Sequence, residues 1–133
     1  MQDYVIWIVL NQKVNKMDYE LLFLKYLVLT ILIETFVLII FFRWIIKQKD
    51  IEIARLLITG IIASFATLPY LWFIFPVYID QKMWYVVFAE SFAVLVETII
   101  IGVILRADFT QSFLCSLTCN MISFLSGLII NMS

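Results

Sequence analysis

Apolar residues recur along this chain in runs that are long enough to cross a lipid bilayer. The runs cover about residues 21–46, 56–79, 84–105 and 112–130, and short polar stretches such as KQKDIE, DQK and ADFTQ separate them. A helix rises about 1.5 Å per residue, so each run reaches across roughly 30 Å of hydrocarbon. Because lipid offers the backbone no hydrogen-bond partners, these segments must be helices. The pattern therefore predicts an all-α, polytopic membrane protein with four transmembrane helices.

The first part of the chain does not fit this pattern. The segment YVIWIVL (4–10) is too short to span a bilayer. It also lacks the basic start and the cleavage site of a signal peptide. Met17 opens a segment that itself reads like a natural beginning. We therefore expect residues 1–16 to be an N-terminal extension, either interfacial or disordered, and residues 17–133 to form the transmembrane domain.

Composition supports a membrane protein and excludes several chemistries. Hydrophobic residues make up 65% of the chain, against about 45–50% in soluble domains. No basic patch suggests nucleic acid as a partner. Histidine is absent, and Cys115 and Cys119 alone are too few to hold a metal ion. Four residues apart on a helix, the two cysteines cannot form an unstrained disulfide, so we interpret them as small packing residues and expect no cofactor.

The placement of lysine and arginine predicts the orientation. The loops after the first and third predicted helices carry five basic residues: Arg43, Lys47, Lys49, Arg55 and Arg106. The opposite side carries four: Lys13, Lys16, Lys25 and Lys82. Counting from Met17 removes Lys13 and Lys16 from the second set. Since basic loops stay in the cytoplasm, we expect both termini outside the cell membrane. Trp72, Tyr78, Trp84 and Tyr85 would then form an aromatic belt at the outer face.

The two halves of the chain echo each other weakly. The segment ETFVLII (34–40) resembles ESFAVLV (90–96), and the same offset aligns Ser64 and Thr67 with Asn120 and Ser123. This match suggests two tandem helical hairpins in the same orientation.

Three carboxylates and one amide interrupt the apolar runs, and they are the candidate proton- or ion-binding residues: Glu34, Glu90, Glu97 and Asn120. Glu90 and Glu97 are seven residues apart, about two helical turns or 10 Å, and share nearly one face. A charged carboxylate facing lipid costs about 3 kcal/mol or more, so these residues must face the bundle interior. There they are protonated, hold a cation or water, or pair with a basic group of another subunit. A protonated glutamate that only joins helices by hydrogen bonds is the structural alternative.

Other polar or unusual residues at membrane depth support this set. Ser64 and Thr67 precede Pro69, which lacks a backbone donor and is expected to kink the second helix. The fourth predicted helix carries Ser116, Asn120, Ser123 and Gly127 at spacings of four, three and four. Such a line of small residues lets another helix approach closely, so we interpret it as a packing seam within or between monomers.

Three segments also resemble a known pattern. They are ATLPYLWFIFP (66–76), AESFAVLVETIIIGVILR (89–106) and NMISFLSGLI (120–129). They are similar to the TLPxxWFxxP, ExxxVLxE and NxxSFxxG motifs of a family of small prokaryotic four-helix membrane proteins, a group with no assigned biochemical function. The resemblance covers roughly residues 18–131. It implies a shared core that includes Glu90, Glu97, Asn120, Ser123, Thr67 and Pro69, and it departs at Ser64, where the family often has Asn.

Two functions remain open. The intramembrane glutamates favour a small carrier or channel component for protons, cations or small solutes. The short loops equally suit a non-catalytic accessory or assembly subunit of a larger membrane complex. An enzyme is not expected, because a peptide-cleaving dyad is normally built from Asp and no Asp lies at depth. Besides the lipid bilayer, we expect either a homo-oligomer or a larger membrane-protein partner.

Overall fold

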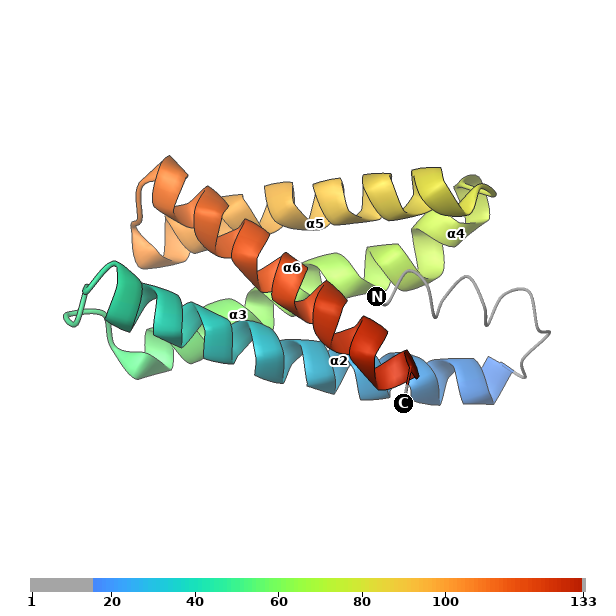
Figure 1. The fold of residues 1–133 in the computed structure, drawn as a ribbon, viewed down its shortest axis with the longest axis horizontal. Helices are drawn as coiled ribbons and strands as arrows, with labels where there is room; N and C mark the ends of the chain where they lie inside the picture. The colour runs from blue at the N-terminus through green and yellow to red at the C-terminus, as the bar shows by residue number, and fades with distance from the viewer. Residues whose placement is uncertain (1–15, 133) are drawn as a thin grey trace.

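The computed structural model describes residues 16–132, and the side chains of residues 17–130. Figure 1 shows a bundle of helices running roughly along one axis. Its elements in chain order are α2 (Lys16–Ile40), the π-helical turn η1 (Phe41–Ile45), α3 (Ile53–Pro69), the π-helical turn η2 (Tyr70–Ile74), α4 (Phe75–Tyr78), α5 (Lys82–Leu105) and α6 (Phe109–Met132).

The described helices form four segments that are long and apolar enough to cross a membrane, namely Met17–Ile45, Ile53–Tyr78, Lys82–Leu105 and Phe109–Ile130. They match the four predicted runs to within a few residues, and the described chain contains no strand. The predicted fold class is therefore confirmed, and it fits a small multi-pass integral membrane protein. The prediction for residues 1–16 lies outside the described part, except that Lys16 begins α2.

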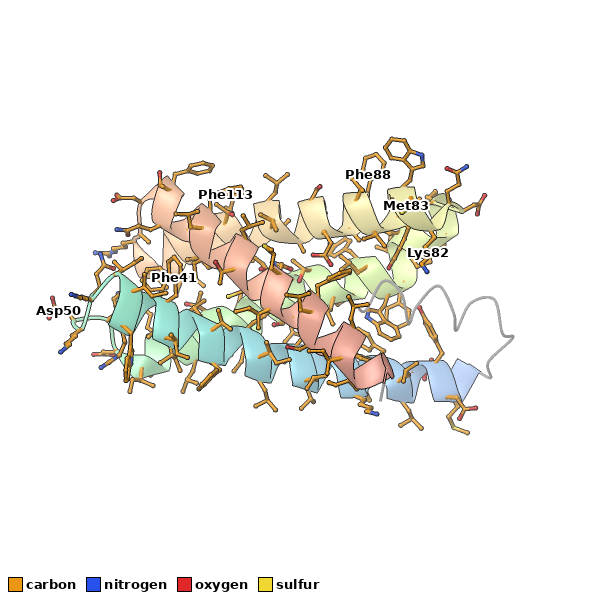
Figure 2. The ribbon with its side chains drawn as sticks, viewed as in Figure 1. Phe41, Asp50, Lys82, Met83, Phe88 and Phe113 are labelled. Atoms are coloured by element: carbon orange, nitrogen blue, oxygen red, sulfur yellow. The ribbon has the colours of Figure 1, made fainter. Side chains whose placement is uncertain are left out.

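The helices pack as two antiparallel hairpins, α2 with α3 and α5 with α6, and contacts of α3 with α5 and of α2 with α6 join the hairpins. α6 crosses the bundle diagonally, from beside the end of α5 to a position over α2 (Figure 1). Figure 2 shows Asp50 at one end of the bundle and Lys82 and Met83 at the other. Charged loop residues thus mark the two ends that would face water.

Two apolar clusters fill the interior. One gathers around Trp72 and Tyr85, and the other around Phe42, Leu56 and Ile101. On α2, α3 and α5 the buried polar side chains lie between these clusters along the sequence. The fold therefore holds a polar layer between two apolar ones.

The first two helices approach most closely at Gly60. A Cβ atom added to Gly60 would lie 3.1 Å from Cα of Thr35 on α2. Because the obstacle includes backbone, it cannot swing aside as a side chain can. Glycine at this position therefore sets the distance between α2 and α3, one turn away from Ser64.

The second span is irregular at the proline where a kink is expected. Pro69 is the last residue of α3 and leads into the π-helical turn η2. The chain then continues into α4. A π-helical turn is one of the established ways in which a helix accommodates a local irregularity, so the helix bulges after Pro69.

Two tyrosine hydroxyls compensate for a second proline in this region. Pro76 has no N–H, so it cannot donate to the carbonyls four or five residues earlier, those of Trp72 and Leu71. The hydroxyl of Tyr19 donates to the carbonyl of Trp72 at 2.5 Å, and that of Tyr85 donates to the carbonyl of Leu71 at 2.6 Å. An unsatisfied carbonyl at membrane depth is costly, and these bonds remove that cost while tying α2 and α5 to η2.

The expected aromatic belt is half wrong. Trp72 and Tyr85 are only 1% and 2% exposed, whereas Tyr78 and Trp84 are 81% and 57% exposed. Trp72 packs against the ring of Tyr26, with ring centroids 5.8 Å apart. Trp72 and Tyr85 belong to one apolar cluster, and the hydroxyl of Tyr85 also bonds the carbonyl of Leu71. Of the four aromatic residues, Tyr78 and Trp84 are the two that lie at the surface.

We expect Tyr85→Phe to lower the free energy of unfolding by about 1–3 kcal/mol, because it leaves the buried carbonyl of Leu71 without that donor. Thermal or detergent-induced unfolding in micelles would measure the change. Tyr78→Phe, at an exposed position, is the matched control and should be neutral. Equal stability of the two variants would contradict the role given to the Tyr85 hydroxyl.

We expect Gly60→Ala to lower the free energy of unfolding by about 1–3 kcal/mol, because the new methyl group forces α2 and α3 apart. Gly102→Ala is the matched control, since the nearest atom to its Cβ would be the side-chain oxygen of Ser112, at 3.3 Å, which can rotate, and the nearest backbone atom would lie at an ordinary contact distance of 3.7 Å. The control should be neutral or slightly stabilising, because alanine favours helices over glycine. A stabilising Gly60→Ala would show that the two helices can separate freely.

Candidate functional site

The polar layer is built around two glutamates on different hairpins. Glu34 on α2 is 4% exposed and Glu97 on α5 is 2% exposed. The hydroxyl of Ser64 on α3 donates a hydrogen bond to Oε2 of Glu34 at 2.6 Å. This bond joins the two helices of the first hairpin at their crossing.

Glu97 accepts hydrogen bonds from two neighbouring helices. Nδ2 of Asn120 and Oγ of Ser116, both on α6, donate to its Oε2 at 2.5 and 3.2 Å. Oγ1 of Thr67 on α3 lies 3.5 Å from its Oε1. A single carboxyl group therefore links α3, α5 and α6, so Glu97 is the junction at which the two hairpins meet.

A cavity of about 20 Å³ adjoins both carboxyl groups. The walls include Glu34, Glu97 and a third carboxylate, Glu90. Four uncharged polar residues complete the polar lining: Thr30, Thr67, Asn120 and Ser123. A cavity needs about 10–15 Å³ of such space to hold one water molecule, with two to four polar partners. The site is therefore large enough and polar enough for a single water molecule.

Each of the three hydroxyls that bond a glutamate has a second acceptor within reach, a backbone carbonyl of its own helix or, for Ser116, of α5. Oγ of Ser64 lies 3.0 Å from the carbonyl oxygen of Gly60, and Oγ1 of Thr67 lies 3.0 Å from that of Ala63. Oγ of Ser116 lies 3.1 Å from the carbonyl oxygen of Val94. Because a hydroxyl carries one hydrogen, each can point either to the carboxyl group or to the helix.

The structure does not bring all the predicted residues into this network. Glu90 and Ser123 line the cavity, and both are half-buried. Pro69 and Gly127 lie outside the cavity wall. The seam of α6 begins at Ser116, and Ser116 and Asn120 face the other helices of the same chain.

Two contributors to the site were not predicted from the sequence. Thr30 lines the cavity, one turn before Glu34 on α2. Its spacing of four residues from a predicted site residue is the signal that would have revealed it. Cys119 is buried, and its thiol lies 3.7 Å from the carbonyl oxygen of Glu34. The two cysteines are free thiols on the packed side of α6.

The hydrogen-bond partners of Glu34 and Glu97 in the described chain are neutral side chains. In residues 16–132 no lysine or arginine is paired with Glu34, Glu90 or Glu97. Nor do three metal-ligating side chains of the described chain gather closely enough to hold a metal ion. Each neutral donor of the site bonds one carboxyl group. This arrangement suits a proton, because a proton binds to a single carboxyl group, whereas a metal ion needs several ligands.

The internal echo does not extend to the hydrogen bonds. By the repeat, the pair Glu34 and Ser64 corresponds to Glu90 and Asn120. Asn120 donates instead to Glu97, two turns further along α5. In the first hairpin a carboxyl group of α2 bonds α3, and in the second a carboxyl group of α5 bonds α6. The two bonds are not at equivalent positions of the repeat.

Comparison with models of known protein families, with curated proteins and with solved structures found no match. The family resemblance of the sequence motifs therefore stays a prediction. The site must be interpreted from its own geometry.

We expect the change Asn120→Leu alone to lower the free energy of unfolding, because it removes the shortest donor to the buried Glu97. Combining it with Glu97→Met removes both partners of the bond. The double variant should lose about 1 kcal/mol less free energy of unfolding than the two single variants lose in total. Unfolding of all four proteins in micelles measures this coupling. Thr118→Ala with Glu97→Met is the control, since Thr118 bonds only the carbonyl of Leu114. If the effects of the single changes simply add in both cycles, a direct bond between Asn120 and Glu97 is contradicted.

Proposed function

We propose that the protein is a small carrier or channel component of the cell membrane, in which Glu97 and Glu34 bind and release protons or other small cations. The observation that carries the proposal is the second acceptor available to each hydroxyl donor. Such a network can hold a glutamate in either protonation state. The predicted placement of both termini outside belongs to this proposal.

At Glu34 the exchange involves one partner. When the carboxyl group is ionised, Ser64 donates to it across the 2.6 Å contact. When the carboxyl group is protonated, it donates to Ser64, whose own hydrogen turns to the carbonyl of Gly60 at 3.0 Å. Both states satisfy every group without moving a heavy atom.

At Glu97 the same exchange is available to two hydroxyls, while the amide stays a donor. Ser116 can turn to the carbonyl of Val94 and Thr67 to that of Ala63. Asn120 keeps one N–H on Glu97 and has the other for the carbonyl of Ser116 at 3.0 Å. A proton can therefore enter or leave Glu97 while Asn120 fixes the carboxyl group in place.

The cavity supplies a route between the carboxyl groups. One water molecule there would contact Glu34 and Glu97, which share its wall. Glu90 extends the line of carboxyls by about 10 Å along α5, toward the end that carries Lys82. Three carboxyls and a water site form a continuous polar path over part of the membrane depth.

The accessory-subunit alternative has one supporting observation. Of the four spans, α6 is the least buried inside the described chain. A partner therefore has room to cover it. The accessory-subunit alternative also requires the glutamates to meet basic groups of the partner. Glu34 and Glu97 are enclosed and bonded within their own chain, which supports the carrier or channel proposal for these two, whereas Glu90 lies on the outer groove.

To test it, the protein is reconstituted in vesicles, and proton flux under a pH gradient is measured with an enclosed pH-sensitive dye. We expect Glu97→Gln to reduce flux by about a hundredfold, the scale on which one positioned proton-transfer group acts. Glu20→Gln, at an exposed position of α2, is the matched control and should retain flux. Unfolding curves check that both variants fold.

Flux in wild-type vesicles that equals flux in protein-free vesicles, or that survives Glu97→Gln, would overturn the proposal. Native mass spectrometry of the gently extracted protein separates the alternative. A fixed ratio with a larger foreign membrane protein would favour the accessory subunit, and a homo-oligomer would favour the carrier.

A further inference from the structure

A wide groove runs between α5 and α6 on the outside of the bundle. It has a volume of about 640 Å³, within the range of roughly 300–1,000 Å³ that is typical of small-molecule sites. Its walls are mainly apolar, with Val86 and Leu95 on α5 and Phe113 and Leu117 on α6. The groove exists because α6 crosses α5 diagonally instead of lying along it (Figure 1).

The groove and the water-sized cavity share part of their walls. Glu90, Asn120 and Phe124 line both. These side chains alone are common to the two spaces, so they form the boundary between the outer groove and the carboxyl site. Phe113, labelled on α6 in Figure 2, lies toward the opposite end of the groove, where α6 begins.

Glu90 differs from the two inner glutamates in its bonding. Glu34 and Glu97 each accept hydrogen bonds from side chains of other helices. Within residues 16–132 Glu90 has no hydrogen bond and no ion pair, and it is half-buried on the groove wall. It lies eight residues into α5, about 12 Å along the helix from Lys82. A carboxyl group at this depth needs a donor, and Glu90 can receive one from the water-sized cavity or from the groove, since it lines both.

We propose that this groove binds an amphiphilic ammonium ion, whose apolar chain lies against α5 and α6 and whose charged head contacts Glu90. An ammonium group offers three N–H donors and the opposite charge, and the apolar walls match an alkyl chain. A lipid acyl chain would match the walls equally well, but it would leave Glu90 without a partner. Charge complementarity therefore selects the cation.

This inference rests on the proposed function and names the class of cation that it handles. An ammonium ion held at Glu90 borders the cavity of Glu34 and Glu97, so the ion and a proton compete for neighbouring carboxyl groups. The cation would enter sideways from the lipid, since the groove opens on the outer surface of the bundle.

The test uses n-octylammonium as the probe and n-octanol as its neutral counterpart, titrated by calorimetry into the purified protein in neutral detergent. We expect saturable binding of n-octylammonium. Glu90→Gln should weaken this binding by about tenfold or more, the effect of losing one charge-assisted contact. Ser91→Ala, which alters an uncharged groove residue, is the matched control and should bind as wild type does.

A second variant guards against misfolding of the first. Leu117→Trp narrows the groove without touching a carboxyl group, and it should weaken binding of n-octylammonium while leaving the unfolding curve unchanged. Absence of saturable binding, equal binding of amine and alcohol, or full binding by both Glu90→Gln and Leu117→Trp would overturn the inference.

The two proposals can fail separately. If flux depends on Glu97 but amine binding does not depend on Glu90, the ammonium site is refuted and the proposed proton transfer is retained. Amine binding that depends on Glu90, together with flux that ignores Glu97, leaves a cation-binding groove and removes the proposed proton transfer.

Discussion

The rest of this structure depends on one constraint, that a polar group at membrane depth is costly unless it finds a hydrogen-bond partner inside the protein. The backbone meets it by forming helices. Where Pro76 interrupts the pattern, the hydroxyls of Tyr19 and Tyr85 reach across from other helices to two open carbonyls. Glu34 and Glu97 meet the same constraint through serine, threonine and asparagine. The bonds that satisfy buried groups are thus also the bonds that fix the helices relative to one another.

Stability and chemistry share the polar layer. Glu97 holds α3, α5 and α6 together through neutral donors, and the two apolar clusters on either side keep bulk water away from it. The hydroxyl donors can satisfy the carboxyl group in two ways, so the layer stays intact whether or not a proton is present. A lysine or arginine partner would have fixed one charge state. Neutral donors leave both states accessible.

The sequence was sufficient for the spans and for the inward position of Glu34 and Glu97, because length, hydropathy and the cost of charge in lipid act locally. It did not reveal which donor meets which carboxyl group. That depends on helix rotation and crossing angle, and so Asn120 pairs with Glu97 although the internal echo places it with Glu90. The burial of Trp72 and Tyr85 was missed for the same reason: Trp72 packs in an apolar cluster, and the hydroxyl of Tyr85 bonds a carbonyl of a neighbouring element. The groove was also beyond the sequence, because it arises from the diagonal course of α6.

The two π-helical turns have a consequence for how the chain tolerates insertions and deletions. A π-helical turn contains one residue more than an α-helical turn, and one residue corresponds to a rotation of about 100° around a helix. η1 follows Glu34 along the first span, and η2 follows Ser64 and Thr67 along the second. Each π-helical turn, with its extra residue, therefore lies between the polar layer and a loop. Changes in loop length can be absorbed there without turning the carboxyl groups or their donors away from one another.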